Sequence, residues 1–277
     1  MSLEGYVVDA RDLSRGRTIA LEATCVLEDF KTEYQHIQVF ETRVFGKVLL
    51  LDGIVMLTEF DEFAYHEMIA HVPLFSHPDP RSVLIIGGGD GGAARESAKH
   101  PGVERIDVCE IDEKVIEVSK KHFPDVACGY DDPRVNVIVE DASEHIKEGK
   151  GGYDVIIVDS TDPVGPGEPL FKEEFYQHLH DSLTDDGIAV TQSESMFYDL
   201  ELIKKMAGFN RRIFPIYSYY FCLIPTYPSG HIGFSYCSKR HGPKPPESIG
   251  ISGLRYYNPE IHRSSFVLPE FAKERIE

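Results

Sequence analysis

Residues 83–92 read VLIIGGGDGG, four apolar residues followed by five glycines that one aspartate interrupts. The apolar run is too short for a helix and predicts a buried β-strand. The glycines allow the backbone to turn sharply and allow a ligand to approach the main chain. Residues 93–100 have helical composition, so the stretch predicts a strand, a glycine turn and a helix. This unit typically opens a doubly wound nucleotide-binding sheet.

The glycine spacing alone fits two classes of enzyme. Gly87, Gly89 and Gly92 match G-x-G-x-x-G, and Glu110 follows at about the distance expected of a ribose-binding acid. Both dinucleotide enzymes and enzymes that use an adenosyl sulfonium compound fit this pattern. Asp90 favours the second class, because a glycine loop at a helix N-terminus attracts anions and a carboxylate inside it favours a cation. The alternative is that Asp90 only caps the helix.

Composition limits the possible partners. The 277 residues suffice for one large domain or for a large and a small one. The net charge of −18 argues against nucleic acid and anionic membranes as partners, and fits either a cationic ligand or a solvated acidic surface. The five cysteines show no C-x-x-C spacing, so we expect reduced cysteines in a cytoplasmic protein. No signal-peptide pattern or membrane-length apolar run is evident.

The first 58 residues predict a small antiparallel β domain. Strand composition alternates there with turn signals, at 18–27, 34–42 and 48–51. Residues 62–75 have apolar side chains at helical spacing. We therefore expect a second domain over 59–277, entered through a linking helix and loop at 59–80.

Strands and helices alternate from residue 82 onward. The expected strands are 83–86, 106–110, 135–139, 155–158 and 188–192. The expected helices are 93–99, 113–122, 143–148, 172–183 and 200–214. This order predicts right-handed βαβ units and a mostly parallel sheet. The runs 216–224 and 232–237 predict an antiparallel hairpin at one edge, which completes a Rossmann-like, seven-stranded sheet of the methyltransferase type.

Acidic residues follow each of the first four strands of this sheet, where ligands bind in such folds. They are Asp90, Glu110, Glu140, Asp141 and Asp159. Individually, Asp141 could cap the next helix, and Asp162 precedes a proline and could belong to a turn. Together they predict a ligand rich in positive charge and in hydroxyl or amino donors.

Residues 159–171 read DSTDPVGPGEPLF and follow the fourth strand. The three prolines and two glycines argue against a continuous helix. A loop of this length at the mouth of a crevice is a candidate lid, and the alternative is an inert connection. The lid residues that we expect are Pro163, Gly165 and Pro166.

Several motifs of the sequence resemble those of the spermidine synthase family of polyamine aminopropyltransferases. They are GGGDGG at 87–92, EID at 110–112, DSTDPVGP at 159–166 and IPTYPSG at 224–230. LDG at 51–53 and DEFAYHE at 61–67 resemble the family's N-terminal junction. The resemblance implies a small β-rich domain before a Rossmann-like domain. It also implies transfer of the aminopropyl group of decarboxylated S-adenosylmethionine to an amine, with release of methylthioadenosine.

The resemblance implies a role for each site residue. The donor-binding residues would be Gln35, Asp90 for the aminopropyl end, Glu110 for the ribose hydroxyls and Asp141 for the adenine amino group. Asp159 would be the catalytic acid, with the acceptor bound by Tyr65, His66, Asp162 and Tyr227. We also expect Glu194 to pair with the far ammonium group of the acceptor, which we take to be putrescine.

Two positions depart from the family pattern. Ala142 stands where members usually have glycine, and the chain lacks the tryptophan that lines the acceptor pocket in many members. Tyr6 stands nearest to that place. We expect no metal, because the histidines show no ligand spacing, and no cofactor besides the donor as co-substrate. The family implies a homodimer or homotetramer.

Other classes of protein share parts of this pattern. A methyltransferase would share the fold and the adenosyl donor, a nicotinamide dehydrogenase would share the glycine loop, and a polyamine-binding protein would bind without turnover. For aminopropyl transfer, the chemical difficulty is the nucleophile, because an alkyl amine with a pKa of about 10.4 is mostly protonated at neutral pH. We expect Asp159 to accept a proton while a closed lid and the tyrosines orient the amine.

Overall fold

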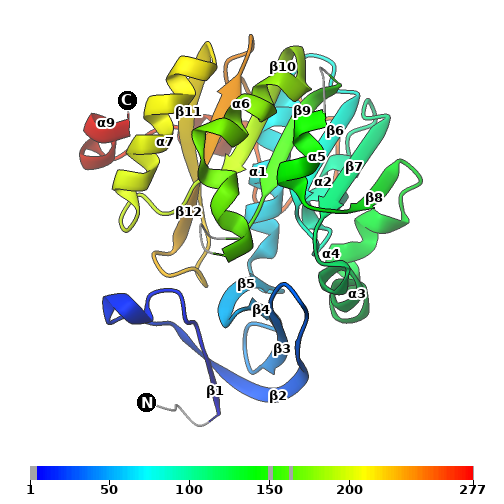
Figure 1. Cartoon of the computed structure of the whole chain (residues 1–277), viewed down its shortest axis with the longest axis vertical. Helices are drawn as coiled ribbons and strands as arrows, with labels where there is room; N and C mark the ends of the chain where they lie inside the picture. Colours follow the sequence, from blue (N-terminus) through cyan, green and yellow to red (C-terminus); the bar gives the residue numbers. More distant parts are fainter. Residues whose placement is uncertain (1–4, 149–151, 162–164, 277) are drawn as a thin grey trace.

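The computed structural model describes residues 5–148, 152–161 and 165–276, and it contains two β-sheets (Figure 1). The N-terminal sheet is antiparallel, with its five strands in sequence order. These strands are β1 (Tyr6–Val8), β2 (Ala20–Lys31), β3 (His36–Thr42), β4 (Lys47–Leu51) and β5 (Ile54–Thr58). Asp52 and Gly53 form the two-residue turn between β4 and β5, and both have positive φ angles, as the tightest hairpin turns require. The predicted N-terminal β domain is confirmed.

The main sheet has seven strands in the order β11-β12-β10-β9-β6-β7-β8. Their bounds are β6 (Ser82–Gly87), β7 (Arg105–Glu110), β8 (Val135–Val139), β9 (Tyr153–Asp159), β10 (Leu183–Gln192), β11 (Ile216–Leu223) and β12 (His231–Ser238). Strands β8, β7, β6, β9 and β10 run parallel, and β12 pairs antiparallel with both β10 and β11. The predicted seven-stranded α/β sheet and its edge hairpin are therefore confirmed.

Alternating side chains of β6 face two helical layers. Val83 and Ile85 pack in a core with α1 (Glu62–Ser76) and α2 (Gly92–Ala98). Leu84 and Ile86 belong to a second core on the opposite face. The helices that contribute to this second core are α5 (Ala142–Glu148), α6 (Glu173–Ser182) and α7 (Leu200–Ile213). Burial on both faces explains why the strand is continuously apolar.

Two helices join the N-terminal sheet to the main sheet. Residues of α3 (Glu113–His122) and α4 (Pro124–Ala127) share an apolar cluster with β3, β4 and β5. Among the cluster members are Val115, Val118, Phe123, Ile37 and Leu49. The remaining elements are η1 (Leu13–Arg15), η2 (Cys128–Asp131), α8 (Pro259–Ser264) and α9 (Glu270–Ile276).

The loop predicted after β9 is partly helical. Residues Gly165–Phe171 form a 3₁₀ helix, η3, so the segment contains helical structure in its second half. A short 3₁₀ segment accommodates proline more easily than an α-helix does, because it contains few backbone hydrogen bonds for proline to remove. Within the described ranges, no helix has the length and apolar character needed to cross a lipid bilayer.

Candidate active site

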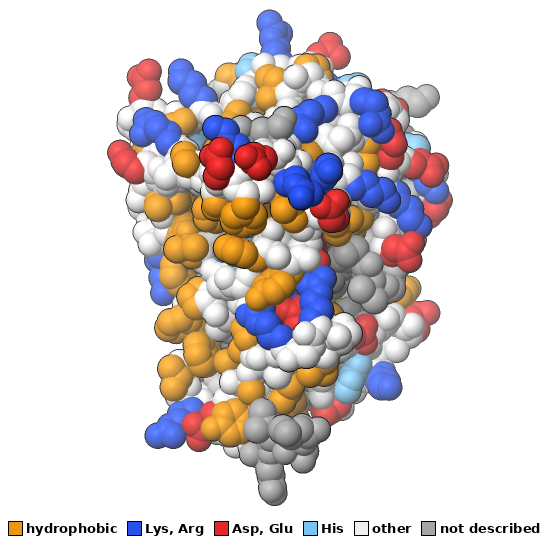
Figure 2. Space-filling view, turned by 90° about the vertical axis from the view of Figure 1, so that its left-hand side faces the viewer, with side chains coloured by type: hydrophobic (Ala, Val, Ile, Leu, Met, Phe, Trp, Pro, Cys, Tyr) orange, Lys and Arg blue, Asp and Glu red, His pale blue; other side chains and the backbone are white. Residues whose placement is uncertain are grey.

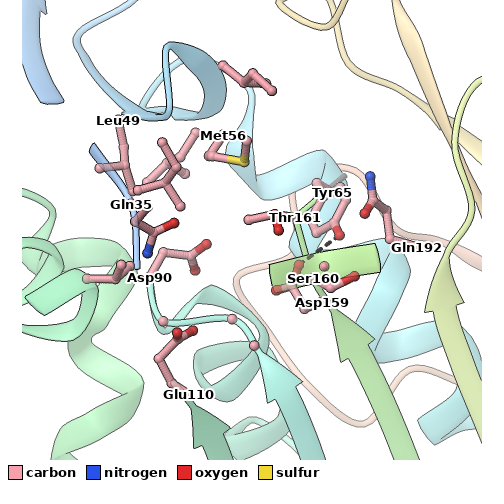
Figure 3. Close-up of a pocket in the computed structure, with 18 of the residues that line it drawn as sticks. Gln35, Leu49, Met56, Tyr65, Asp90, Glu110, Asp159, Ser160, Thr161 and Gln192 are labelled. Atoms are coloured by element: carbon pink, nitrogen blue, oxygen red, sulfur yellow. Dashed lines mark hydrogen bonds between the residues drawn. The ribbon is translucent and has the colours of Figure 1, made fainter. Parts of the chain in front are cut away.

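A cavity lies between the two sheets, at the carboxyl ends of the main-sheet strands (Figure 3). Its floor is formed by the glycine loop after β6 and by the ends of β7 and β9. Its roof comes from β4 and β5 of the N-terminal domain, through Leu49, Leu51, Met56 and Leu57. Figure 3 shows Gln35 and Glu110 on one side of this space and Tyr65, Asp159 and Gln192 on the other.

The glycine loop brings β6 unusually close to its neighbours. Gly87 has a φ of +76°, and a Cβ atom there would lie 2.2 Å from the carbonyl oxygen of Asp159. The amide of Gly88 donates a 2.8 Å hydrogen bond to that same oxygen. A Cβ atom at Gly92 would lie 2.3 Å from the imidazole of His66. The lack of side chains at Gly87, Gly88 and Gly92 therefore allows Asp90, Asp159 and His66 to lie close together.

Asp90 precedes the N-cap of α2, bonds to the first amide of that helix and also forms a wall of the cavity. Its Oδ1 accepts a 2.7 Å hydrogen bond from the amide of Gly92 and lies 3.2 Å from Nε2 of His66. Nδ1 of His66 lies 2.6 Å from Glu62. Burial favours the neutral imidazole, but the carboxylates of Asp90 and Glu62 outweigh burial and raise the pKa of His66 well above its ordinary value. Burial likewise opposes ionisation of Asp90, but the charged His66 lowers the pKa of Asp90.

Asp159 ends β9 and accepts a 2.7 Å hydrogen bond from the hydroxyl of Tyr65. Burial and the nearby charge of Asp90 raise the pKa of Asp159 to about 6. Its second oxygen, Oδ2, has no hydrogen-bond partner among the described residues. The carboxylate is therefore ionised near neutral pH, with one oxygen held in place and the other able to accept a proton.

Glu110 and Gln35 lie at the other end of the cavity. Burial raises the pKa of Glu110 to about 7, although its Oε1 accepts a 3.0 Å hydrogen bond from the amide of Asp112. Asp112 also accepts a 2.9 Å hydrogen bond from Nε2 of Gln35, which belongs to the turn between β2 and β3. Through Asp112, the N-terminal domain is thus fixed beside Glu110.

Asp141 lines the cavity and also begins α5. Its Oδ1 accepts a 2.8 Å hydrogen bond from the amide of Ser143, so the capping interpretation of the sequence also applies. Tyr227 lines the cavity as well, but its hydroxyl donates a 2.8 Å hydrogen bond to the carbonyl of Met56. Tyr227 therefore links the main domain to the roof.

Glu194, which was expected at the acceptor site, and Tyr6, which stands nearest to the missing tryptophan, do not line the cavity. Glu194 is buried with a φ of +62°, and its carboxylate pairs with the guanidinium of Arg11. Arg11, from the N-terminal domain, lines the cavity in its place. Burial of a carboxylate is unfavourable unless an opposite charge neutralises it, and Arg11 of the same chain supplies that charge to Glu194. Tyr6 lies on β1 with 47% of its surface exposed, so it does not replace the missing tryptophan as a pocket wall.

The predicted lid is only partly within the described structure. Asp162 and Pro163 lie outside the described residues. Gly165 and Pro166 begin η3, from which Gly167 and Leu170 line the cavity. Sequence reasoning did not identify Arg11, Gln192 or the apolar roof. Strand alternation marks the roof residues as buried, but no local signal distinguishes a cavity wall from a core.

The chain matches two family models. The spermine/spermidine synthase domain matches residues 62–245, and the spermidine synthase tetramerisation domain matches residues 11–59. The chain belongs to the spermidine synthase family of polyamine aminopropyltransferases. Two relatives align with the aminopropyltransferase along nearly its full length. A polyamine aminopropyltransferase of Leptospira biflexa is 46% identical over 277 residues, which covers 99% of each chain. A spermidine synthase of Dictyostelium discoideum is 44% identical over 276 residues, covering 98% of this chain and 97% of its own.

Solved spermidine synthases have the same fold as this aminopropyltransferase. One, in complex with the transition-state analogue AdoDATO, superposes with a TM-score of 0.95 at 40% identity, over 99% of this chain and 96% of its own. The spermidine synthase of Thermotoga maritima superposes with a TM-score of 0.93 at 40% identity, and the match covers 98% of this chain and 94% of that one. The fold and the reaction class predicted from the motifs are thereby confirmed.

Proposed function

We propose that this aminopropyltransferase moves the aminopropyl group of decarboxylated S-adenosylmethionine to putrescine, giving spermidine and 5′-methylthioadenosine. The observation that carries the proposal is the arrangement of acids along one cavity. Glu110, Asp90 and Asp159 follow the neighbouring strands β7, β6 and β9, with Asp90 in the middle and within 4.8 Å of Asp159. A related spermidine synthase binds the transition-state analogue AdoDATO, which supports binding of the reactants by this fold.

The donor would lie with its adenosine beside Glu110 and its aminopropyl group beside Asp90. Glu110 and Gln35 would bind the ribose end, Asp141 the adenine amino group, and the apolar roof would cover the ring. Asp90, kept ionised by His66, would hold the terminal ammonium group. The carboxylate of ordinary S-adenosylmethionine would be repelled there, which distinguishes this enzyme from a methyltransferase.

The reaction itself is a displacement at the carbon beside the sulfonium. The nitrogen of the acceptor forms a bond to this carbon, and the C–S bond breaks with its electron pair remaining on a neutral thioether. The acceptor must first become neutral, which costs about 4–5 kcal/mol for an amine with a pKa of about 10.4 at neutral pH. Asp159 would accept the proton, and Tyr65 would keep the carboxylate oriented toward the amine.

The acceptor is tested by supplying the purified enzyme with the decarboxylated donor and one amine at a time, with products identified by mass. Putrescine should give the highest kcat/KM. Cadaverine has one more methylene and should retain some turnover, since apolar pockets discriminate one methylene by only about 1–3 kcal/mol. A higher kcat/KM with agmatine or spermidine would overturn the acceptor assignment. An absence of aminopropylated product with every amine would overturn the reaction.

The role of Asp159 has its own test. Asp159→Asn keeps the shape of the side chain but removes the proton acceptor, so we expect kcat to fall by about 10²–10⁴-fold with nearly unchanged donor affinity. Calorimetry of donor binding alongside turnover separates these two quantities. Turnover close to that of the wild type would contradict the assignment.

We further propose that the enzyme is a homodimer or homotetramer. The match of residues 11–59 to a spermidine synthase tetramerisation domain supports this. Large hydrophobic side chains are also exposed near the β11 edge and the C-terminal segment, namely Phe197, Leu223, Val267 and Phe271. Figure 2 shows hydrophobic side chains distributed over one side of the molecule. Light scattering after size exclusion should give a multiple of the 31.2 kDa chain, and a monomer at micromolar concentration would contradict the proposal.

A further inference from the structure

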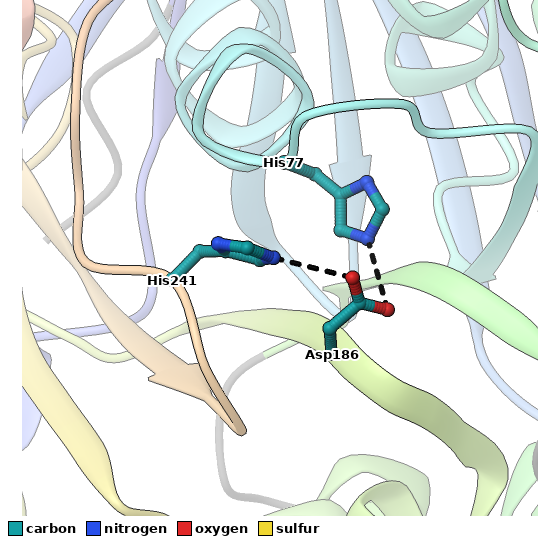
Figure 4. Close-up of side chains that lie close together, drawn as sticks. All are labelled: His77, Asp186 and His241. Atoms are coloured by element: carbon teal, nitrogen blue, oxygen red, sulfur yellow. Dashed lines mark hydrogen bonds and ion pairs between the residues drawn. The ribbon is translucent and has the colours of Figure 1, made fainter.

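Three side chains converge at the end of the main sheet opposite the cavity: His77, Asp186 and His241 (Figure 4). His77 follows the last residue of α1, whose first turns carry Tyr65 and His66 to the cavity. His77 follows His66 by eleven positions, which corresponds to about 16 Å along the helix axis. The three side chains belong to segments far apart in the sequence, so residue spacing gave no sign of them.

The sheet register explains why these segments meet. Asp186 lies near the start of β10, and the cavity lies at the other end of that strand. β12 runs antiparallel to β10, with Ser238 opposite Ile188. The chain leaving β12 therefore brings His241 beside Asp186. None of the three side chains lines the cavity.

The geometry of the cluster suits a tetrahedral ion. Nε2 of His241 lies 3.2 Å from one carboxylate oxygen of Asp186, and Nε2 of His77 lies 3.6 Å from the other. One ligand atom from each residue lies within 4.8 Å of the others. A tetrahedral ion bound at about 2.1 Å separates its ligand atoms by roughly 3.4 Å, which is within the 4.8 Å limit that the three ligand atoms of this cluster satisfy.

A second observation also points to a ligand. His77 is only 6% exposed, and its Nε2 has no hydrogen-bond partner among the described residues. The 3.6 Å contact with Asp186 is longer than a hydrogen bond. Buried polar atoms are normally satisfied, so an unsatisfied nitrogen that faces a carboxylate and a second imidazole calls for an explanation.

We propose that His77, Asp186 and His241 bind one transition-metal ion of the Zn²⁺ class, with the fourth position open to water. Two imidazoles and one carboxylate favour Zn²⁺, Co²⁺ or Ni²⁺ over Mg²⁺ and Ca²⁺, which prefer oxygen ligands. The ion would tie the end of α1 to β10 and to the segment after β12. It would be structural, since the active-site cavity is at the other end of the sheet.

Binding has one identifiable cost at His77. Its Nδ1 accepts a 3.2 Å hydrogen bond from the amide of Asp79, so the neutral ring carries its proton on Nε2. When the ion binds Nε2, it replaces the proton there, and the ring carries its proton on Nδ1 instead. The hydrogen bond from the amide of Asp79 to Nδ1 is then lost. Asp186 needs no such change, because its two carboxylate oxygens already face the two imidazole nitrogens.

The test is titration of Zn²⁺ into protein in which the exposed thiols are removed by Cys25→Ser and Cys128→Ser. We expect one Zn²⁺ per chain. His77→Ala, His241→Ala and Asp186→Asn should each weaken binding by more than about tenfold, since even indirect partners of a metal ligand change affinity by that much. His36→Ala is the matched control, because His36 pairs with Asp29 at 2.7 Å on an exposed surface and should not affect binding.

Stability and turnover complete the test. Zn²⁺ should raise the unfolding temperature of the parent by about 5 °C at a hundredfold excess over Kd, and it should not do so in the three variants. Mg²⁺ should not reproduce the effect. Retained turnover without added metal shows that a variant is folded. If His77→Ala fails to fold, His241→Gln tests the less buried of the two histidines. Absence of Zn²⁺ binding at micromolar concentration, or equal binding in the ligand variants, would overturn the site.

Discussion

The hydroxyl of Tyr65 donates a 2.7 Å hydrogen bond to Oδ1 of Asp159 across 94 residues of sequence. The two side chains come from α1 and the end of β9. Burial and Asp90 raise the pKa of Asp159, whereas His66 and the hydrogen bond from Tyr65 lower it. Tyr65 therefore influences both the orientation and the acidity of the proposed proton acceptor.

Tyr65→Phe should lower kcat and change its pH dependence. Asp159 must be ionised to accept a proton, so kcat/KM should fall as the pH decreases through the pKa of about 6. Losing the Tyr65 hydroxyl removes a contribution that lowers this pKa, so the acidic limb should move to higher pH. We expect kcat to fall by about 10–100-fold, as for loss of a hydrogen bond to a charged group. Tyr227→Phe is the control: it loses a hydrogen bond to the carbonyl of Met56, so the acidic limb of its pH profile should not move. A shift of the acidic limb to lower pH in Tyr65→Phe would contradict the prediction.

Asp90→Asn should weaken discrimination between donors. The carboxylate is expected to attract the terminal ammonium of decarboxylated S-adenosylmethionine and to repel the carboxylate of S-adenosylmethionine. The ratio of the two dissociation constants, measured by calorimetry, should shrink by about tenfold, as expected for loss of one charge pair. Asp141→Asn serves as the control, because Asp141 likewise accepts a hydrogen bond from the amide two residues later, and its loss should affect both donors equally. If the ratio is unchanged in Asp90→Asn, Asp90 acts only as a helix cap.

Glu110→Gln should stabilise the empty enzyme while weakening donor binding. Burial raises the pKa of Glu110 from 4.5 to about 7, so the folded state retains a proton that the unfolded state has lost between these values. Wild-type stability relative to the variant should therefore fall as pH rises from 4.5 through 7. Across this pH range, the free energy of unfolding of the wild type relative to the variant should fall by about 3 kcal/mol at most. Thermal unfolding at pH 5 and pH 8.5 measures it, and an equal effect at both values would contradict the prediction.

The segment Gly165–Phe171 should gain amide protection when the cavity is filled. Gly167 and Leu170 of this segment line the cavity, so ligands there should contact it. Hydrogen exchange with and without methylthioadenosine plus putrescine tests the proposed lid. β12, whose eight residues are all buried, supplies the internal reference. Equal protection of Gly165–Phe171 in both states would remove the lid from the mechanism.

Arg11→Gln should change acceptor preference. Arg11 lines the cavity and neutralises the buried Glu194. When the positive charge of Arg11 is removed, an acceptor with an additional ammonium group should be repelled less. The ratio of kcat/KM for spermidine to kcat/KM for putrescine should therefore rise by about tenfold. Arg15→Gln is the control, because Arg15 pairs with Asp199 across the same domain junction but does not line this cavity. The same rise in both variants would indicate general loosening of the junction.

The elements of the main sheet could be predicted because their signals are local. The run from Val83 to Ile86 is apolar at every position because both faces of β6 are covered. The acids that line the cavity after β6, β7 and β9 follow from the rule that ligands bind at the carboxyl ends of such strands. The hairpin at the sheet edge was equally visible from its two strand-like runs.

The parts that could not be predicted depend on contacts between distant segments. Nothing near Glu194 indicates that Arg11 will neutralise it, since one residue is in the N-terminal domain and the other follows β10. Tyr6 occupies the expected sequence position, but the direction of its side chain is set by the pairing of β1 with β2. His77, Asp186 and His241 likewise meet only through the sheet register.

Gly92 has an ordinary φ angle, so its lack of a side chain is required by space and not by backbone conformation. A single methyl group at this position would collide with the imidazole of His66 without touching any ligand. Displacing that imidazolium would leave Asp90 without its counterion and would expose Asp159 to a stronger negative field. The charge balance of the reaction centre thus depends on an uncharged residue. Even Gly92→Ala would change the electrostatics of the site, because it would displace the charge of His66 from Asp90 and Asp159.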